Sequence, residues 1–187
     1  MRGLLILLLI AVAAAVLPDA ARADQAGWDA LREPDTAVLI RHAEAPGTGD
    51  PAGFRLDDCG TQRNLSRRGR RQAEAMGQAL RTNAVTIDRV LTSQWCRTRE
   101  TAELMAVAPV EEEPALNSFF SDRRARQAQS ERLIERLRAL PKGAKVALVT
   151  HQVNITALTG VYPRSGEMIV VRLEPDGRLA VLGRIRV

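Results

Sequence analysis

The chain has 187 residues, 45% of them hydrophobic and 26% charged, which suits one globular domain and excludes a disordered or collagen-like chain. Lys and Arg number 27 against 22 Asp and Glu, a formal net charge of +5, and only Lys142 and Lys145 among these cations are lysines. A basic protein attracts anionic partners, but 3% aromatic residues are too few for a platform that stacks nucleic-acid bases.

The N-terminus has the features of a secretory signal peptide. Arg2 gives a cationic start, residues 4–17 are uninterruptedly apolar, and Ala21-Arg22-Ala23 has small residues where a signal peptidase reads them. The apolar run is shorter than the roughly 20 residues that a membrane-spanning helix needs. We expect residues 1–23 to be removed, residues 24–187 to form one domain, and the mature protein to be periplasmic or secreted. The alternative is an uncleaved N-terminal anchor.

The rest of the chain alternates strand and helix patterns. We expect, in chain order, a strand at 36–40, a loop at 50–64, a helix capped by Ser66 that ends near 82, a strand at 89–92, a helix at 98–106, an irregular segment at 109–126, a helix at 127–140, a strand at 145–150, a helix at 153–158, and a hairpin of strands 167–173 and 179–185. Continuously apolar strands are typical of parallel sheets buried on both faces. The pattern predicts an α/β fold, a three-layer α/β/α sandwich with a mainly parallel sheet and a C-terminal hairpin.

Cys59 and Cys96 are the two cysteines. In an oxidising compartment they have one intramolecular pairing, and such a disulfide would stabilise the fold by roughly 3–4 kcal/mol. Two separate buried thiols are the alternative. A cysteine phosphatase needs Arg six residues after Cys, where this chain has Leu65 and Ala102. The cysteines and histidines are also too scattered to predict a zinc site.

The two histidines of the chain, His42 and His151, each directly follow a predicted buried strand. In open α/β sheets the carboxyl ends of strands are where ligands bind. One such histidine is more often structural, but two in equivalent positions favour a site. Arg41 precedes the first, and Arg97 follows the strand at 89–92. Because Arg makes bidentate contacts to phosphate, the pattern indicates a phosphate-binding site.

These residues resemble the motifs of the histidine phosphatase (phosphoglycerate mutase-like) superfamily. Arg41-His42-Ala43 is similar to its Arg-His-Gly signature, with Ala in place of Gly. The later segments that match, in the family's order, are Leu65-Ser66 with Gly69 and Gln72-Ala73, Ser93 with Arg97-Thr98 and Thr101-Ala102, and Val149-Thr150-His151. The resemblance runs from about residue 36 to 155 and implies a histidine phosphatase-like domain.

The resemblance also implies roles. His42 would be the nucleophile that forms a phosphohistidine, Arg41 and Arg97 would clamp the phosphate oxygens, and His151 would donate to the same phosphoryl group. Such a set needs no metal ion or other cofactor. His42 would need a hydrogen bond to its other ring nitrogen, for which we expect a backbone carbonyl in the following loop.

The general acid departs from the family pattern. Mutase-like members place a Glu near the position of Ser118, and the acid-phosphatase branch places an Asp where this chain has Gln152. Glu44 and Asp122 are the candidate substitutes, with Asp57 and Asp58 as further candidates.

Three functions compete on these observations. The first is an exported, metal-independent phosphatase acting on a small or envelope-associated phosphate, without nucleic-acid partners and without membrane insertion after signal cleavage. The second is a catalytically weak or inactive member of the same fold that binds phosphate. The third is a basic envelope protein that adheres to anionic polymers through its arginines, with binding that collapses in salt.

Overall fold

The computed structural model describes residues 19–187, with side chains from residue 24 on. Most of the predicted signal peptide, residues 1–18, lies outside the described residues. The described helices and strands are α1 (Asp19–Arg32), β1 (Thr36–Arg41), α2 (Arg67–Thr82), β2 (Arg89–Thr92), α3 (Cys96–Met105), β3 (Val110–Glu112), α4 (Arg126–Arg138), β4 (Val146–Thr150), α5 (Gln152–Thr159), β5 (Met168–Leu173) and β6 (Leu179–Ile185).

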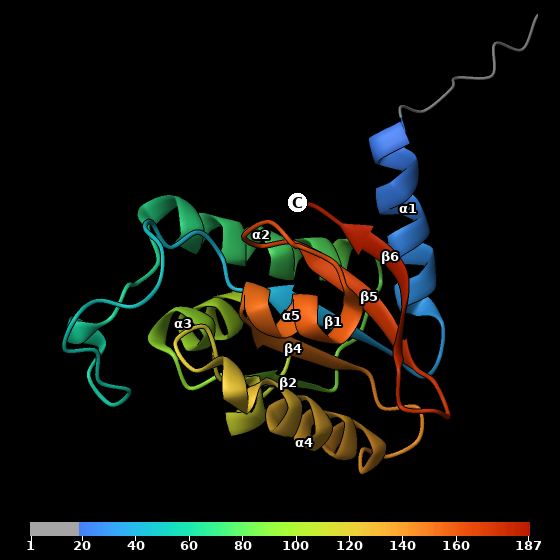
Figure 1. The fold of residues 1–187 in the computed structure, drawn as a ribbon. Coiled ribbons are helices and arrows are strands. Elements are labelled where there is room, and N and C mark those ends of the chain that lie inside the picture. Colours follow the sequence, from blue (N-terminus) through green and yellow to red (C-terminus); the bar gives the residue numbers. More distant parts are fainter. Residues whose placement is uncertain (1–18) are drawn as a thin grey trace, which may run out of the picture.

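One six-stranded sheet organises these elements, in the order β3-β2-β4-β1-β5-β6 (Figure 1). The strands β3, β2, β4 and β1 are parallel, whereas β5 and β6 form an antiparallel hairpin that pairs β5 with β1. A sheet that is mainly parallel with a C-terminal hairpin is what the sequence predicts. The central strand β4 is buried along its whole length, as its continuous apolar sequence requires.

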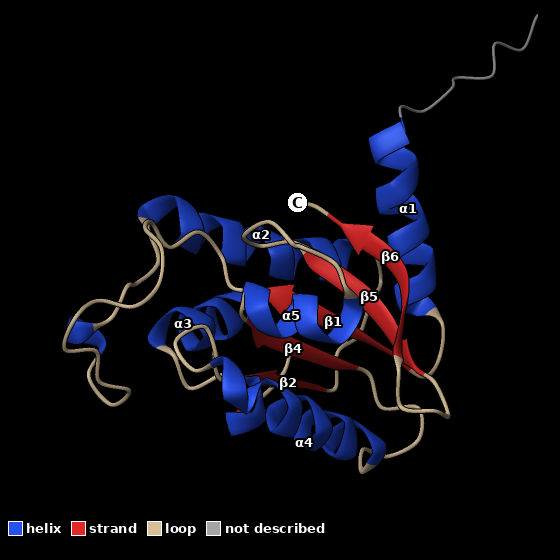
Figure 2. Ribbon diagram, in the orientation of Figure 1, coloured by secondary structure: helices blue, strands red, loops and turns tan. Residues whose placement is uncertain are grey.

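Helices cover both faces of the sheet, which confirms the three-layer architecture (Figure 2). On one face α1, α2 and α3 contribute Leu31, Met76 and Met105 to a buried cluster. On the other face α4 and α5 contribute Leu133 and Ile155 to a second cluster. No helix within residues 19–187 is long and apolar enough to cross a membrane.

The N-terminal cap of α2 forms as predicted, because the Ser66 hydroxyl accepts a hydrogen bond from Gly69 N at 2.9 Å. Two predictions for other elements need correction. The segment expected to be irregular contains the three-residue edge strand β3, too short and too exposed to show a periodic pattern. The helix expected to begin at residue 98 begins at Cys96.

Helix α1 was not predicted, and it packs along β6. Trp28 and Leu31 on this helix are buried. Gly27 faces β6 so closely that a Cβ there would lie 2.6 Å from Ile185 Cγ1, which accounts for a glycine in mid-helix. The packed residues of α1 named here all lie after Ala23, where the sequence predicts cleavage.

Candidate active site

The sheet places the two histidines side by side. The strands β1 and β4 are parallel neighbours, with Arg41 opposite Thr150, so the next residue of each strand leaves the sheet at the same edge. His42 N donates a hydrogen bond to Thr150 O at 3.0 Å, and the ring centroids of His42 and His151 are 5.6 Å apart.

The hydrogen bond of His42 sets its tautomer. Nδ1 lies 2.8 Å from the carbonyl oxygen of Ala43, and because a carbonyl can only accept, Nδ1 carries the hydrogen. The lone pair of the ring is therefore on Nε2. Burial, and then the charge of Arg97, lower the pKa of His42 to about 3, so the ring is neutral near pH 7. The carbonyl expected from the sequence is thus that of Ala43.

Side chains of the matched motifs hold the loop that follows His42. Ala43 N donates to Thr101 Oγ1 at 3.1 Å, and Glu44 N donates to Gln72 Oε1 at 3.0 Å. Gly69 lies against this loop, where a Cβ would overlap the carbonyl oxygen of Glu44. Motif residues on α2 and α3 therefore hold the loop that follows His42 in place.

Three arginines line the cavity in front of His42: Arg41, Arg97 and Arg63. Arg41 is anchored by a hydrogen bond from Nη1 to Pro163 O at 2.9 Å. Within the described residues, the buried Nε atoms of Arg41 and Arg97 have no hydrogen-bond partner. A buried donor without a partner is costly, so both guanidinium groups are held at a cost in hydrogen bonding.

Arg63 was not singled out from the sequence. Its Nε donates to Gly49 O at 3.0 Å, and its Nη1 donates to Ala45 O. Burial, and then the charge of Arg97, lower its pKa to about 10, so it stays a cation at neutral pH. No sequence signal marks this residue, because it lies in a loop and follows neither a strand nor a motif.

His151 lies between Ser93 and Arg97. Ser93 Oγ is 2.8 Å from His151 Nε2, and Arg97 Nη2 is 3.4 Å from His151 Nδ1. Since the guanidinium can only donate, Nδ1 is the acceptor and Nε2 carries the hydrogen. Burial and the charge of Arg97 lower the pKa of His151 well below its usual value, so this ring is also neutral at pH 7.

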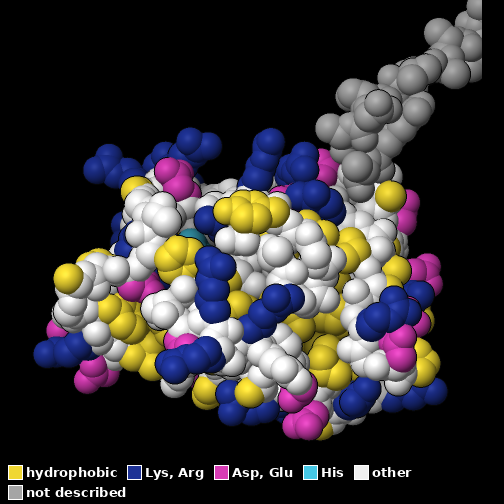
Figure 3. All heavy atoms as spheres, in the orientation of Figure 1, with side chains coloured by type: hydrophobic (Ala, Val, Ile, Leu, Met, Phe, Trp, Pro, Cys, Tyr) yellow, Lys and Arg dark blue, Asp and Glu magenta, His cyan; other side chains and the backbone are white. Residues whose placement is uncertain are grey.

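The cavity that these residues surround has a volume of about 140 Å³. Its lining residues are Arg41, His42, Gly47, Thr48, Gly49, Asp50, Arg63, Arg97, Ser118, Phe120, His151, Gln152, Val153 and Tyr162. Three guanidinium groups and one carboxylate give this lining a net charge of +2, which matches a phosphate dianion. In Figure 3 a small histidine surface, drawn in cyan, is visible in a hollow of this face, with hydrophobic and basic side chains around it.

The carboxylates proposed from the sequence do not line this cavity. Glu44 lies 3.3 Å from Arg68 Nε, and Asp122 pairs with Arg124 on the surface, where that hydrogen bond lowers the pKa of the carboxyl. Asp58 instead caps the 3-10 helix at Cys59–Thr61. Glu44, Asp122 and Asp58 are therefore held elsewhere by neighbouring arginines or backbone amides.

Arg55 pairs with both Asp57 and Asp58, and these two carboxylates are also absent from the cavity lining. Ser118 and Gln152, the two positions where related proteins have an acid, do line it. The carboxylate that lines the cavity belongs to Asp50, which the sequence did not single out. Asp50 lies in a loop next to Gly49, so neither strand position nor helical periodicity marks it.

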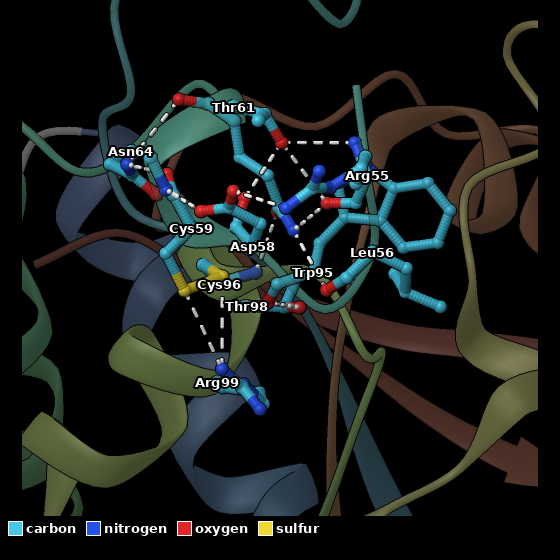
Figure 4. Close-up of a disulfide and its surroundings, with 12 residues drawn as sticks. Arg55, Leu56, Asp58, Cys59, Thr61, Asn64, Trp95, Cys96, Thr98 and Arg99 are labelled. Carbon is cyan, nitrogen blue, oxygen red and sulfur yellow. Dashed lines mark hydrogen bonds and ion pairs between the residues drawn. A yellow bond between two sulfur atoms is a disulfide. The ribbon is translucent and has the colours of Figure 1, made fainter. Parts of the chain in front are cut away.

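The predicted disulfide between Cys59 and Cys96 is present, with a Cα–Cα distance of 5.7 Å. It joins the loop after β1 to the first residue of α3, directly before Arg97 (Figure 4). Gln62 makes a second link, because its Oε1 accepts a hydrogen bond from Cys96 N at 3.0 Å. The loop and the start of α3 are therefore tethered next to the cavity.

Among residues 19–187, no cluster of three or more His, Cys, Asp or Glu side chains is arranged to hold a metal ion. The positive charge that the described cavity offers to an anion comes from its arginines.

Comparisons with known proteins agree with this geometry. Residues 37–123 match the family model of the histidine phosphatase superfamily (branch 1). No curated protein matches the chain significantly.

Three solved structures illustrate the fold similarity. A protein assigned as an alpha-ribazole-5'-P phosphatase of Escherichia coli has 20% identity and a TM-score of 0.60, covering 83% of this chain and 100% of its own. One assigned as the phosphohistidine phosphatase SixA of Agrobacterium tumefaciens has 19% identity and a TM-score of 0.56, covering 83% and 99%. A phosphoserine phosphatase of Entamoeba histolytica has 14% identity and a TM-score of 0.59, covering 81% and 97%. At these identities the likeness concerns the fold.

Proposed function

The chain belongs to the histidine phosphatase superfamily, and we propose that it is an exported, metal-independent phosphatase that hydrolyses a phosphomonoester or related phosphate through a phosphohistidine on His42. The observation that carries the proposal is the state of His42. Its Nδ1–H is bound to Ala43 O and its ring is neutral, which leaves the Nε2 lone pair available in a cavity lined by three arginines. A neutral imidazole with a fixed tautomer is the form that can attack phosphorus.

The arginines supply the charge that phosphoryl transfer requires. Catalysis of this reaction depends mainly on positioning and on stabilising charge on the equatorial oxygens. Arg41 and Arg97 would bind these oxygens through their guanidinium groups, and Arg63 would add a third cation. His151 accepts a hydrogen bond from Arg97 at Nδ1, and we propose that its Nε2–H, which faces Ser93 Oγ in this structure, turns to the phosphoryl group as a donor when substrate binds.

The reaction has two steps. In the first, the Nε2 lone pair forms an N–P bond while the bond from phosphorus to the leaving oxygen breaks, and that oxygen takes up a proton. In the second, water attacks phosphorus and gives up a proton to a base, and the N–P bond breaks. The products are inorganic phosphate and neutral His42. The Nδ1–H of His42 keeps its bond to Ala43 O in both steps.

Export rests on the N-terminal sequence, and two structural features support it. A disulfide is typical of an oxidising compartment. Cleavage after Ala23 would also leave Trp28 and Leu31 packed on the sheet, so the mature domain would keep its core. N-terminal sequencing of the processed protein should begin at Asp24, and a start at Met1 would contradict cleavage.

The activity is tested with p-nitrophenyl phosphate in the presence of a metal chelator, comparing the wild-type protein with His42→Ala. We expect chelator-insensitive turnover in the wild type, no turnover in the variant, and an acid-labile phosphoryl group trapped on His42 after rapid quenching. Absence of turnover on aryl phosphate, acyl phosphate and pyrophosphate would contradict the phosphatase. If the wild type still bound phosphate, that result would favour a phosphate-binding member of the fold.

A further inference from the structure

The proposed reaction needs a proton donor for the leaving group, and the structure has a carboxylate in the cavity that the family motifs do not supply. We propose that Asp50 is the general acid of the first step and the general base of the second. This inference rests on the phosphatase function proposed above. It assigns the acid to a loop residue that lies outside both positions where related proteins carry one.

The first argument is location. Asp50 lines the same cavity as His42 and His151, and its side chain is only 15% exposed. Asp50 Oδ1 accepts a hydrogen bond from Arg97 Nη1 at 2.8 Å, and Asp50 Oδ2 accepts one from Trp95 Nε1 at 3.2 Å. These bonds place the carboxylate against the guanidinium that would bind the phosphate.

The second argument is charge. Without substrate, the carboxylate is balanced by Arg97, with Arg41 and Arg63 also lining the cavity and both histidines neutral. A bound phosphate dianion brings two negative charges to the same arginines, and a like charge nearby favours the protonated carboxyl. Substrate binding would therefore convert Asp50 from the ion-pair partner of Arg97 into a proton donor.

The proton comes with the substrate. Phosphate monoesters have a second pKa of about 6, so part of the substrate is a monoanion at neutral pH. Transfer of that proton to Asp50 leaves the dianion bound to the arginines and a neutral carboxyl beside it. When the bond to phosphorus breaks, the leaving oxygen takes this proton. Asp50 then accepts a proton from the water that attacks the phosphohistidine, so the cycle balances.

The third argument is the tether. The disulfide Cys59–Cys96 and the bond from Cys96 N to Gln62 join the loop of Asp50 to the start of α3, which carries Arg97. Trp95 adds a contact, because it stacks on Phe54 of the loop with a centroid distance of 5.1 Å. While the loop is closed, these contacts hold the carboxylate beside Arg97, in the fixed position that proton transfer requires.

The test is Asp50→Asn, which keeps an oxygen that can accept from Arg97 but cannot transfer a proton. General acid catalysis contributes about 10²- to 10⁴-fold, and most for a poor leaving group. We expect kcat/KM for an alkyl ester such as glycerol 2-phosphate to fall by about 100-fold or more, and kcat/KM for 2,4-dinitrophenyl phosphate to fall by less than about fivefold. With the latter substrate the variant should show a burst of dinitrophenol, because the phosphohistidine hydrolyses slowly without a base.

A purely positioning role predicts a different result. If Asp50 only orients Arg97, Asp50→Asn lowers kcat/KM by the same factor for both esters, shows no burst and weakens binding of inorganic phosphate, and this pattern would overturn the inference. If Asp50 is the acid, its negative charge repels phosphate in the wild type, so Asp50→Asn should bind inorganic phosphate at least as tightly as the wild type. Such binding also shows that the variant is folded.

The matched control is Asp58→Asn, a carboxylate of the same loop that does not line the cavity. It should keep the wild-type ratio of kcat/KM between the two esters. If the wild type hydrolyses neither ester, the phosphatase itself fails and the assignment of Asp50 fails with it. A wild type that hydrolyses both, with an unchanged ratio in Asp50→Asn, refutes the assignment of Asp50 alone.

Discussion

The cavity has a floor and a wall that are built differently. The floor consists of Arg41, His42 and His151 at the ends of β1 and β4, with Arg97 at the start of α3. The wall includes Asp50 and Arg63 on the loop between β1 and α2, and Ser118, Phe120 and Tyr162 on two other connections. The three floor residues at the strand ends are fixed by backbone hydrogen bonds of the buried sheet. The wall is fixed by one disulfide and by side-chain bonds to backbone atoms.

This difference teaches which parts of the site tolerate change. The sheet cannot shift without exposing the buried side chains of β1 and β4 on both faces, so the floor has one arrangement. The wall loop has few buried apolar side chains and several local hydrogen bonds, so it can open at lower cost. We therefore expect floor substitutions to act on the chemical step, and wall changes other than at Asp50 to act first on stability and selectivity.

The largest effect should come from Arg97→Lys in the floor. Lysine keeps the charge but loses the planar fork that binds two oxygens and the contact to His151, so we expect kcat/KM for p-nitrophenyl phosphate to fall by about 100-fold or more. Steady-state kinetics measure this. Arg89→Lys, at the opposite end of β2 and largely outside the sheet core, is the control and should change kcat/KM little. A loss below about tenfold for Arg97→Lys would mean that the floor does not clamp the phosphate.

Removing the disulfide tests the wall. The bond closes a loop with a sequence separation of 37 residues, and its loss in Cys59→Ala/Cys96→Ala should lower the free energy of unfolding by roughly 3–4 kcal/mol. Urea unfolding measures the change, and the reduced wild-type protein should lose a similar amount. Residual turnover should exceed that of Arg97→Lys, because the floor stays in place. Complete inactivation of a folded double variant would contradict this separation of floor and wall.

A smaller effect should appear in the pH dependence of stability. The pKa of His42 is about 3 in the fold and about 6.5 in an unfolded chain. Above pH 6.5 the ring is neutral in both states, but below it only the unfolded state binds the proton. The free energy of unfolding should then fall by about 1.4 kcal/mol per pH unit from His42 alone, with His151 acting in the same direction. His42→Gln should remove that part of the slope in urea unfolding between pH 6 and pH 5. An unchanged slope would show that the buried ring is not the cause.

The sequence predicted the floor because periodicity and strand ends are local signals. His42, His151 and Arg41 follow or end continuously apolar strands, and parallel strands bring their carboxyl ends together. The disulfide was also predictable, since two cysteines in a chain that the sequence predicts to be exported have one pairing. The structure brings the four predicted floor residues into one cavity, and their catalytic roles remain proposals.

The wall was not predictable in the same way. Asp50 and Arg63 lie in a loop whose path depends on side-chain contacts, one to the distant Trp95 and one within the loop from Arg63 to Gly49. Glu44 and Asp122 were stronger candidates for the general acid from the sequence, because both lie close to the motifs. In the structure, arginines on the surface hold both carboxylates outside the cavity. Helix α1 was not predicted because it overlaps the end of the predicted signal peptide. Strand β3 was not predicted because its three exposed residues carry no pattern.

The hydrogen bond from His42 N to Thr150 O has a consequence for exchange with solvent. It extends the ladder between β1 and β4, so the amide of His42, the proposed nucleophile, cannot open without separating two central strands. In amide hydrogen exchange, the amide proton of His42 should exchange as slowly as those of the core, through global unfolding. Amides of the loop at 47–58 should exchange faster, through local opening. Movement of the proposed nucleophile would then require cooperative unfolding of the sheet. The substrate would meet a rigid His42 Nε2 behind a more mobile loop.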